Sequence, residues 1–157
     1  MAGRKIDSID RQLLALLQEN NLQTSDELAE RVGRSSSVIA RRLRRIRTDG
    51  LVVSEGAQIS PEAAGCLLSA VVHVQLERHA RHETDQLVRE LAASAHVQLC
   101  FEISGAFDLL LMVVAHDMAE FNRFADDTLA KNAGVRRYET MFVKKRVKAT
   151  LAFPIVP

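Results

Sequence analysis

The chain is organised around an arginine-rich stretch at residues 34–47, which reads Arg34-Ser35-Ser36-Ser37-Val38-Ile39-Ala40-Arg41-Arg42-Leu43-Arg44-Arg45-Ile46-Arg47. It contains six arginines and no acidic residue. Its apolar residues recur at helical spacing, so one face can pack on a core. The opposite face begins with serines, which can cap the helix, and continues with arginines. This pattern is typical of a helix that enters the DNA major groove. A solvated basic face is the alternative, and the segment alone does not decide between them.

The residues on either side of this arginine-rich stretch favour its interpretation as a helix that enters the DNA major groove. Apolar residues at helical spacing predict a first helix over residues 7–20, and Thr24 with Glu27 forms a capping box that starts a second. Gly33 supplies a tight turn before the basic helix, and Gly50 supplies a left-handed stop after it. Three helices with a glycine-containing turn between the second and third predict a winged-like helix-turn-helix domain.

A change of pattern after the third helix indicates a domain boundary. Short β-type runs at residues 51–53 and 57–59 either pair as a small wing or lead out as a linker strand. Pro61 and Gly65 then interrupt the chain. The predicted parts are a helix-turn-helix domain over 1–52, a linker strand or hinge over 53–66, and a second domain over 67–157.

The second domain alternates strand and helix patterns. The order predicts a ferredoxin-like βαββαβ unit, an antiparallel sheet with two helices on one face, so the fold class is α+β. The strand patterns lie at residues 67–76, 97–103, 109–115 and 137–143, the helix patterns at 87–95 and 117–132, and a further strand is expected at 148–155. Strand residues of both parities are apolar, so the second sheet face also needs a cover. A second copy of the sheet is the natural cover and predicts a homodimer whose paired helices read two half-sites.

Charge is distributed unevenly along the chain. Residues 1–50 hold 10 Lys and Arg against 7 Asp and Glu, whereas residues 51–157 hold 11 against 13. Nucleic acid is therefore expected as a partner of the first part only. Cys66 and Cys100 form no CxxC pair, which argues against a zinc finger and fits the reducing cytoplasm. The sequence has no apolar run long enough for a membrane span.

Motifs for catalysis and for cofactors are missing from the sequence. We find no nucleophile with a matching base, no P-loop and no GxGxxG motif, so we expect neither an enzyme nor a cofactor. His79 and His82 have i, i+3 spacing, but no third ligand is near, so no metal site is expected.

Several short motifs occur in a fixed order along the chain. They are Ile6-Asp7-Ser8-Ile9-Asp10-Arg11-Gln12-Leu13-Leu14, Glu27-Leu28-Ala29, Val32-Gly33, Ser35, Arg41-Arg42-Leu43, Gly50-Leu51-Val52 and Ser104-Gly105-Ala106-Phe107-Asp108. In this order they resemble the Lrp/AsnC (leucine-responsive, feast/famine) family of transcription regulators, and the resemblance covers nearly the whole chain. It implies an N-terminal helix-turn-helix joined to an effector-sensing ferredoxin-like domain. It also implies dimers that assemble to tetramers or octamers, with amino acids bound between dimers near a Gly-x-x-Asp loop.

The chain departs from the family pattern at positions that carry charge. Arg34 replaces the usual Leu and Arg47 stands where an acidic residue is common, so both add positive charge near the basic helix. Glu55 replaces an aromatic residue in the linker. Ala106 replaces the first acidic residue of the family's "GDYD" loop, while Asp108 remains. A carboxylate that would pair an amino group is therefore missing at position 106.

The candidate site residues fall into two groups. For DNA we predict contacts from the outer face of the basic helix, and we expect Arg42 to be a structural salt-bridge partner instead. The predicted DNA contacts are Ser35, Ser36, Ser37, Ala40, Arg41, Arg44 and Arg45. For the effector we predict contacts at the Gly-containing turn and the fourth strand, although any β-hairpin needs such a turn. The predicted effector contacts are Ser104, Gly105, Ala106, Asp108, Thr140 and Met141.

The resulting prediction is a cytoplasmic, sequence-specific DNA-binding transcription regulator that responds to a small effector, with an amino acid suspected. The alternative is an architectural protein of the same family that wraps DNA without an effector, and the altered loop at Ala106 favours it. A third class, enzymes of similar architecture that decarboxylate tetrapyrroles, has no use for an arginine-rich groove reader.

Overall fold

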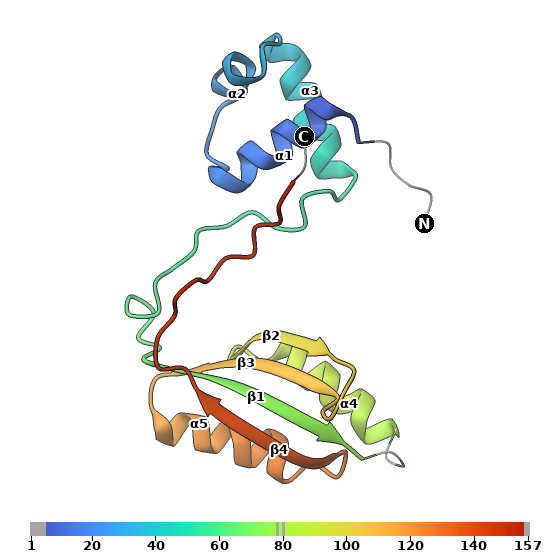
Figure 1. Cartoon of the computed structure of the whole chain (residues 1–157), viewed down its shortest axis with the longest axis vertical. Coiled ribbons are helices and arrows are strands. Elements are labelled where there is room, and N and C mark those ends of the chain that lie inside the picture. The colour runs from blue at the N-terminus through green and yellow to red at the C-terminus, as the bar shows by residue number, and fades with distance from the viewer. Residues whose placement is uncertain (1–5, 78, 80, 156–157) are drawn as a thin grey trace. The chain divides into compact units, whose positions relative to one another are not determined.

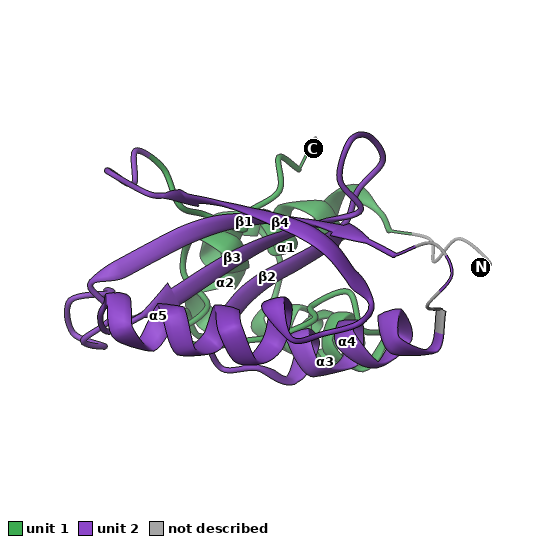
Figure 2. Ribbon diagram, turned by 90° about the horizontal axis from the view of Figure 1, so that it is seen from below, with its two compact units in different colours: residues 1–58, 148–157 green, residues 59–147 purple. Residues whose placement is uncertain are grey.

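The structure, a computed structural model, describes residues 6–77, 79 and 81–155, and the chain divides into two units. One unit holds residues 1–58 together with 148–157, and the other holds residues 59–147 (Figure 2). The chain therefore passes between the units twice. The C-terminal segment groups with the helices, whereas the sequence pattern placed it with the second domain.

The helical unit contains α1 (Ser8–Glu19), α2 (Ser25–Val32) and α3 (Ser36–Thr48), labelled in Figure 1, so the three predicted helices are confirmed. Asp7 caps α1 and Thr24 caps α2, each within a reciprocal capping box that satisfies backbone donors at the helix start. The core lies between the three helices. Its fully buried members are Leu13, Leu28, Ile39 and Ile46.

Glycine ends the last two helices as the sequence predicts. Gly33 after α2 has φ of 68° and Gly50 after α3 has φ of 65°, the left-handed region that other residues avoid. The segment that follows differs from the prediction, because no residue between 51 and 59 lies in a strand. Neither a wing nor a linker strand forms there.

The expected fifth strand at residues 148–155 is also absent from the described part of the chain. This segment instead contacts α1. The side-chain amide of Gln18 donates to the carbonyl oxygen of Phe153 at 3.0 Å and accepts from its N–H at 2.7 Å. One glutamine side chain thus satisfies both backbone groups of Phe153, as a neighbouring strand would.

The second unit is the predicted ferredoxin-like βαββαβ arrangement. Its elements are β1 (Leu68–Leu76), α4 (Arg81–Ala93), β2 (Val97–Glu102), β3 (Leu109–Ala115), α5 (Met118–Phe124) with its π-helical continuation η1 (Ala125–Ala130), and β4 (Val135–Phe142). All the strand pairs are antiparallel, and the order across the sheet is β2-β3-β1-β4. Figure 2 shows α4 and α5 on the same side of this sheet.

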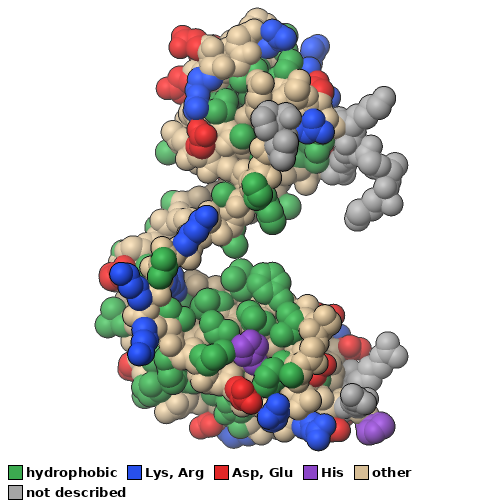
Figure 3. Space-filling view, in the orientation of Figure 1, with side chains coloured by type: hydrophobic (Ala, Val, Ile, Leu, Met, Phe, Trp, Pro, Cys, Tyr) green, Lys and Arg blue, Asp and Glu red, His purple; other side chains and the backbone are tan. Residues whose placement is uncertain are grey.

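Alternation along the strands divides the sheet into a buried face and an open face. On the helix side, Val72 is fully buried and pairs with Leu111 and Thr140. On the other side the side chains are also largely apolar, and Phe101 and Met141 stay 50% and 51% exposed. We call this side the open face, and Figure 3 shows hydrophobic side chains gathered on the sheet unit around a histidine. Its apolar members include Val71, Leu99, Phe101, Leu110, Met112 and Met141.

Within the described residues, no helix is both long and apolar enough to cross a membrane.

Candidate functional site

The outer face of α3 presents arginines without acidic partners. Arg41 and Arg44 are exposed, and among the described residues no carboxylate lies within ion-pair distance of either. The apolar side of the same helix is buried through Ile39, Leu43 and Ile46. The helix is therefore fixed to its unit by one face while the other offers uncompensated guanidinium groups, which suit phosphates and guanine edges.

The remaining arginines of α3 are held by acidic residues. Asp10 on α1 is completely buried, and its Oδ1 accepts a charge-assisted hydrogen bond from Nη1 of Arg42 at 2.8 Å. Arg42 also donates to Oδ2 of Asp7 at 2.7 Å, and Arg45 donates to Oδ2 of Asp10. The salt-bridge role predicted for Arg42 is confirmed. Sequence reasoning missed Asp10, because the pairs with Arg42 and Arg45 span 32 and 35 residues.

These contacts perturb the ionisation of the groups involved. The backbone N–H of Asp10 and the guanidinium of Arg42 lower the pKa of the Asp7 carboxyl. The carboxylates of Asp7 and Asp10 raise the pKa of the Arg42 guanidinium. The network thus places negative charge at the start of α1 opposite positive charge on α3 and connects the two helices there.

The serines at the start of α3 do not cap the helix through their side chains, so that prediction is wrong. Ser35 is the N-cap residue, but its side chain makes no capping hydrogen bond, and its Oγ lies 3.3 Å from Oγ of Ser37. The two hydroxyls bond to each other in place of the backbone. Ser35 and Ser37 are exposed, which leaves the first turn of α3 open to an outside partner.

The two departures from the family pattern at Arg47 and Glu55 compensate each other. Nη2 of Arg47 donates to Oε1 of Glu55 at 2.9 Å, and Nε donates to the same oxygen at 3.2 Å. The positive charge that Arg47 adds to α3 is therefore engaged by the acidic residue that replaces the linker aromatic. Sequence reasoning noted both positions without pairing them.

The loop between β2 and β3 is tied to the end of β1 by Asp108. Its Oδ2 accepts from the backbone N–H of Leu76 at 2.8 Å, and its own N–H donates to the carbonyl oxygen of Val74 at 2.9 Å. Asp108 therefore has a structural role in the hairpin. Phe107 beside it stacks on His73 with ring centroids 5.2 Å apart, and the guanidinium carbon of Arg137 lies 5.0 Å from the Phe107 centroid.

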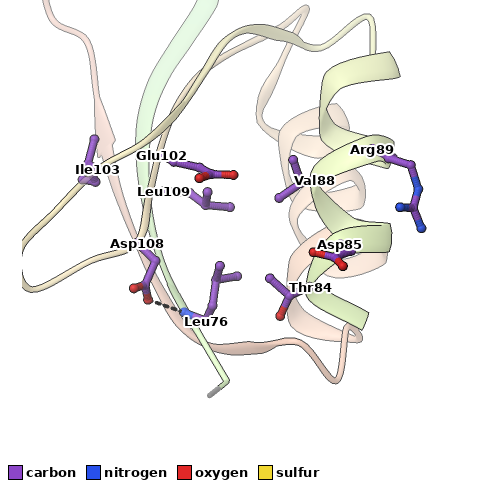
Figure 4. A pocket seen from close by; sticks show the side chains of 9 residues that line it. All are labelled: Leu76, Thr84, Asp85, Val88, Arg89, Glu102, Ile103, Asp108 and Leu109. Carbon is purple, nitrogen blue, oxygen red and sulfur yellow. Dashed lines mark hydrogen bonds between the residues drawn. The ribbon is translucent and has the colours of Figure 1, made fainter. Parts of the chain in front are cut away.

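A cavity of about 410 Å³ lies between α4 and the end of the sheet near this loop. Figure 4 shows Thr84 and Val88 directed from α4 toward the strands, with Arg89 turned outward. The cavity is lined by Leu76, Thr84, Asp85, Val88, Arg89, Glu102, Ile103, Asp108 and Leu109. The carboxylates of Asp85, Glu102 and Asp108 outnumber the guanidinium of Arg89, so the cavity suits the ammonium group of a ligand better than a ligand's carboxylate.

Only one predicted effector contact, Asp108, lines this cavity. Ser104, Gly105 and Ala106 lie exposed in the adjoining loop. Thr140 pairs with Val72 on the helix side of the sheet, whereas Met141 pairs with Val71 on the open face. Because successive strand residues point to opposite faces, those two cannot line the same side of one pocket. The contributions of Asp85 and Glu102 were missed, since they come from α4 and β2. The described residues contain no group of three or more acidic, histidine or cysteine side chains arranged to hold a metal.

Family models match both units. The model described as Lrp/AsnC ligand binding domain matches residues 69–153, and the model described as winged helix-turn-helix DNA-binding matches residues 6–53. Together they cover nearly the whole chain, in the order that the sequence predicts.

Two bacterial relatives match this chain along most of their own length. The chain is 35% identical over 151 residues to an uncharacterised HTH-type transcriptional regulator of Sinorhizobium fredii, covering 96% of this chain and 89% of that protein. It is 30% identical over 146 residues to the leucine-responsive regulatory protein of Escherichia coli, covering 93% and 89% of the two chains.

Solved structures agree with the fold and the sequence. A transcriptional regulator of Neisseria meningitidis in complex with L-Met superposes with a TM-score of 0.89 at 33% identity, covering 96% of this chain and 97% of that one. An AsnC family transcriptional regulator of Agrobacterium tumefaciens gives a TM-score of 0.87 at 26% identity, covering 94% and 96%. The chain therefore belongs to the Lrp/AsnC family of helix-turn-helix transcriptional regulators.

Proposed function

We propose that this regulator reads its operator with the outer face of α3 and adjusts that binding to a small effector of the amino-acid class. The observation that carries the DNA assignment is the exposure of Arg41 and Arg44 on α3, whose opposite face is buried in the core. Neither arginine has an acidic partner among the described residues. Ser35, Ser36, Ser37 and Ala40 at the start of α3 permit close approach of a backbone. Arg45 contributes a further DNA contact, although its guanidinium also donates to the carboxylate of Asp10.

An amino acid is the proposed effector because a neighbour at 33% identity was solved with L-Met. In this chain the acidic cavity near Asp108 offers carboxylates for the ligand's ammonium group, and the loop at Ser104, Gly105 and Ala106 offers backbone donors for its carboxylate. The Ala106 loop lacks one acid of the family pattern, and Asp85 and Glu102 supply that charge from another direction. The effector-independent architectural alternative is less favoured on this ground.

A panel of the twenty amino acids tests the effector proposal. We expect at least one to raise the melting temperature by several degrees, since a ligand at 100 times its Kd stabilises a protein by about 2.7 kcal/mol. The same amino acid should change operator affinity in a gel-shift titration and the oligomer size in light scattering. A flat response in all three measurements would favour the architectural alternative.

The proposed assembly is a homodimer formed through the open face of the sheet, which then associates into tetramers or octamers. The apolar side chains of this face have no cover in the described part of the chain, and the helices occupy the other side. Such an exposed apolar patch marks an interface. A second copy is the chosen occupant because paired α3 helices match the two half-sites of an operator.

Acidic substitutions on the open face test this dimer. Phe101→Glu with Met141→Glu replaces two half-exposed apolar side chains, so the fold of each subunit should persist. We expect the dimer dissociation constant to rise at least roughly tenfold, because each buried anchor contributes on the order of 1–2 kcal/mol. Met118→Glu is the matched control, as Met118 is 46% exposed at the start of α5. An unchanged mass in light scattering for the double variant would contradict the assignment.

We further propose that the protein acts in the cytoplasm by binding alone, without catalysis, cofactor or metal. Cys66 and Cys100 are both unpaired thiols, as expected in a reducing compartment. Its named relatives are transcriptional regulators, which supports a binding function.

A further inference from the structure

A second concentration of positive charge follows β4, in the sheet unit. Lys144, Lys145 and Arg146, here named the basic segment, are three consecutive exposed cations. Hydrogen bonds hold the ends of this stretch against the start of β1. The N–H of Val143 donates to the carbonyl oxygen of Ser69 at 2.8 Å, and Nη2 of Arg146 donates to the Ser69 hydroxyl at 2.8 Å. The segment is therefore positioned by the sheet.

The basic segment is exceptional in an otherwise acidic unit. Residues 59–147 carry 10 Lys and Arg against 12 Asp and Glu. Without the basic segment this balance would be 7 against 12. Positive charge is thus gathered at one place in a unit that would otherwise repel a polyanion.

The three cations also lack the ion pairs that neutralise others in the same unit. Lys131 is paired with Asp127 and Arg137 with Glu139. No described carboxylate lies within ion-pair distance of the basic segment. Its members do not line the acidic cavity, so they do not belong to the effector site.

We propose that the basic segment binds the phosphate backbone of duplex DNA, as a contact additional to that of α3. The segment follows the end of β4 and belongs to no helix, so it does not repeat the helical groove reader formed by α3. Phosphate contact requires only accessible cations, and duplex DNA presents about one negative charge per 1.7 Å of its axis. The contact is sequence-independent, strengthens binding to longer duplexes and rests on the DNA binding proposed above.

The salt dependence of DNA binding tests this proposal. The triple variant Lys144→Gln, Lys145→Gln and Arg146→Gln is compared with the wild-type chain on a long duplex containing the operator and on a short duplex limited to it. Because each neutralised phosphate contributes about 0.9 to the slope of log K against log salt, the slope on the long duplex should fall by about 2 to 3. The slope on the short duplex should change less.

A matched control separates this contact from a general effect of charge. Arg123, Lys131 and Arg136 are exposed cations of the same unit, and replacing all three by glutamine removes the same charge. This control should leave the slope on the long duplex nearly unchanged. Equal slopes for the triple variant and the wild-type chain would overturn the proposal, as would equal losses in the variant and the control. A wild-type chain that bound neither duplex would overturn the proposed DNA binding as well, which distinguishes the two failures.

Discussion

Replacing Arg41 and Arg44 together by alanine is expected to remove sequence-specific DNA binding. Both side chains are exposed on α3, and neither has an acidic partner among the described residues, so the variant should fold normally. A lost bidentate contact to a base costs about 1–3 kcal/mol, which lowers affinity roughly 5- to 150-fold for each arginine. In a gel-shift titration the specific complex should disappear at protein concentrations that shift the wild-type operator completely.

Arg31 provides the control for this result. It is also an exposed arginine of the helical unit, but it belongs to α2 and is paired with Glu19 at 3.1 Å. Arg31→Ala removes the same kind of charge away from the outer face of α3, so we expect only a small loss of affinity. Operator binding that survived the double substitution, or fell equally in the control, would show that α3 does not read the operator. Unchanged melting temperatures would exclude unfolding as the cause.

The helical unit was predictable where its signals are local. The Thr24 capping box, the glycines at positions 33 and 50 and the apolar stripe of α3 each act within one turn of the residues they organise. Short runs of β-type and apolar residues between turn residues indicated the strands in the same way, although only residues 97–103 alternate strictly. The order of elements then leaves few topologies, and the ferredoxin-like arrangement is the one observed.

The side-chain network of the same unit was not predictable, because its members are distant in sequence. Asp10 is a first-turn residue of α1 by pattern, a position where acids are common for local reasons. Only the packed structure brings it to Arg42 and Arg45 on α3. The pairing of Arg47 with Glu55 and of Gln18 with Phe153 likewise depends on where separate segments meet.

The lining of the cavity proposed for the effector could be predicted least well, for a related reason. Resemblance places the ligand near the loop at Asp108, but a cavity is built from every element around it. Asp85 and Glu102 reach it from α4 and β2, and no sequence motif connects these positions. Thr140 and Met141 are neighbours in the sequence, but strand alternation places their side chains on opposite faces of the sheet.

Asp10→Ala should destabilise the protein more than any other polar substitution in the helical unit. Asp10 is completely buried and accepts from both Arg42 and Arg45, so its removal takes a buried partner from two guanidinium groups. Breaking a buried ion pair from one side typically costs about 3–5 kcal/mol. We expect the lower end of that range, about 3 kcal/mol, because Arg45 is half-exposed and Arg42 keeps Asp7. The loss is measured as a change in the free energy of unfolding in urea.

Asp7→Ala is the comparison that identifies burial as the cause. Asp7 shares Arg42 with Asp10 but its side chain is 51% exposed, so its removal should cost less. Its pKa is lowered from the ordinary value of 3.8 in the folded state, so its contribution is present above that value and is lost as pH falls through the folded pKa. Asp7→Ala should therefore weaken the acid dependence of stability below about pH 4. An Asp10→Ala variant no less stable than Asp7→Ala would mean that the buried carboxylate does not hold α3 to α1. Because the same network fixes the helix that carries Arg41 and Arg44, Asp10→Ala should also weaken operator binding at temperatures well below its unfolding transition.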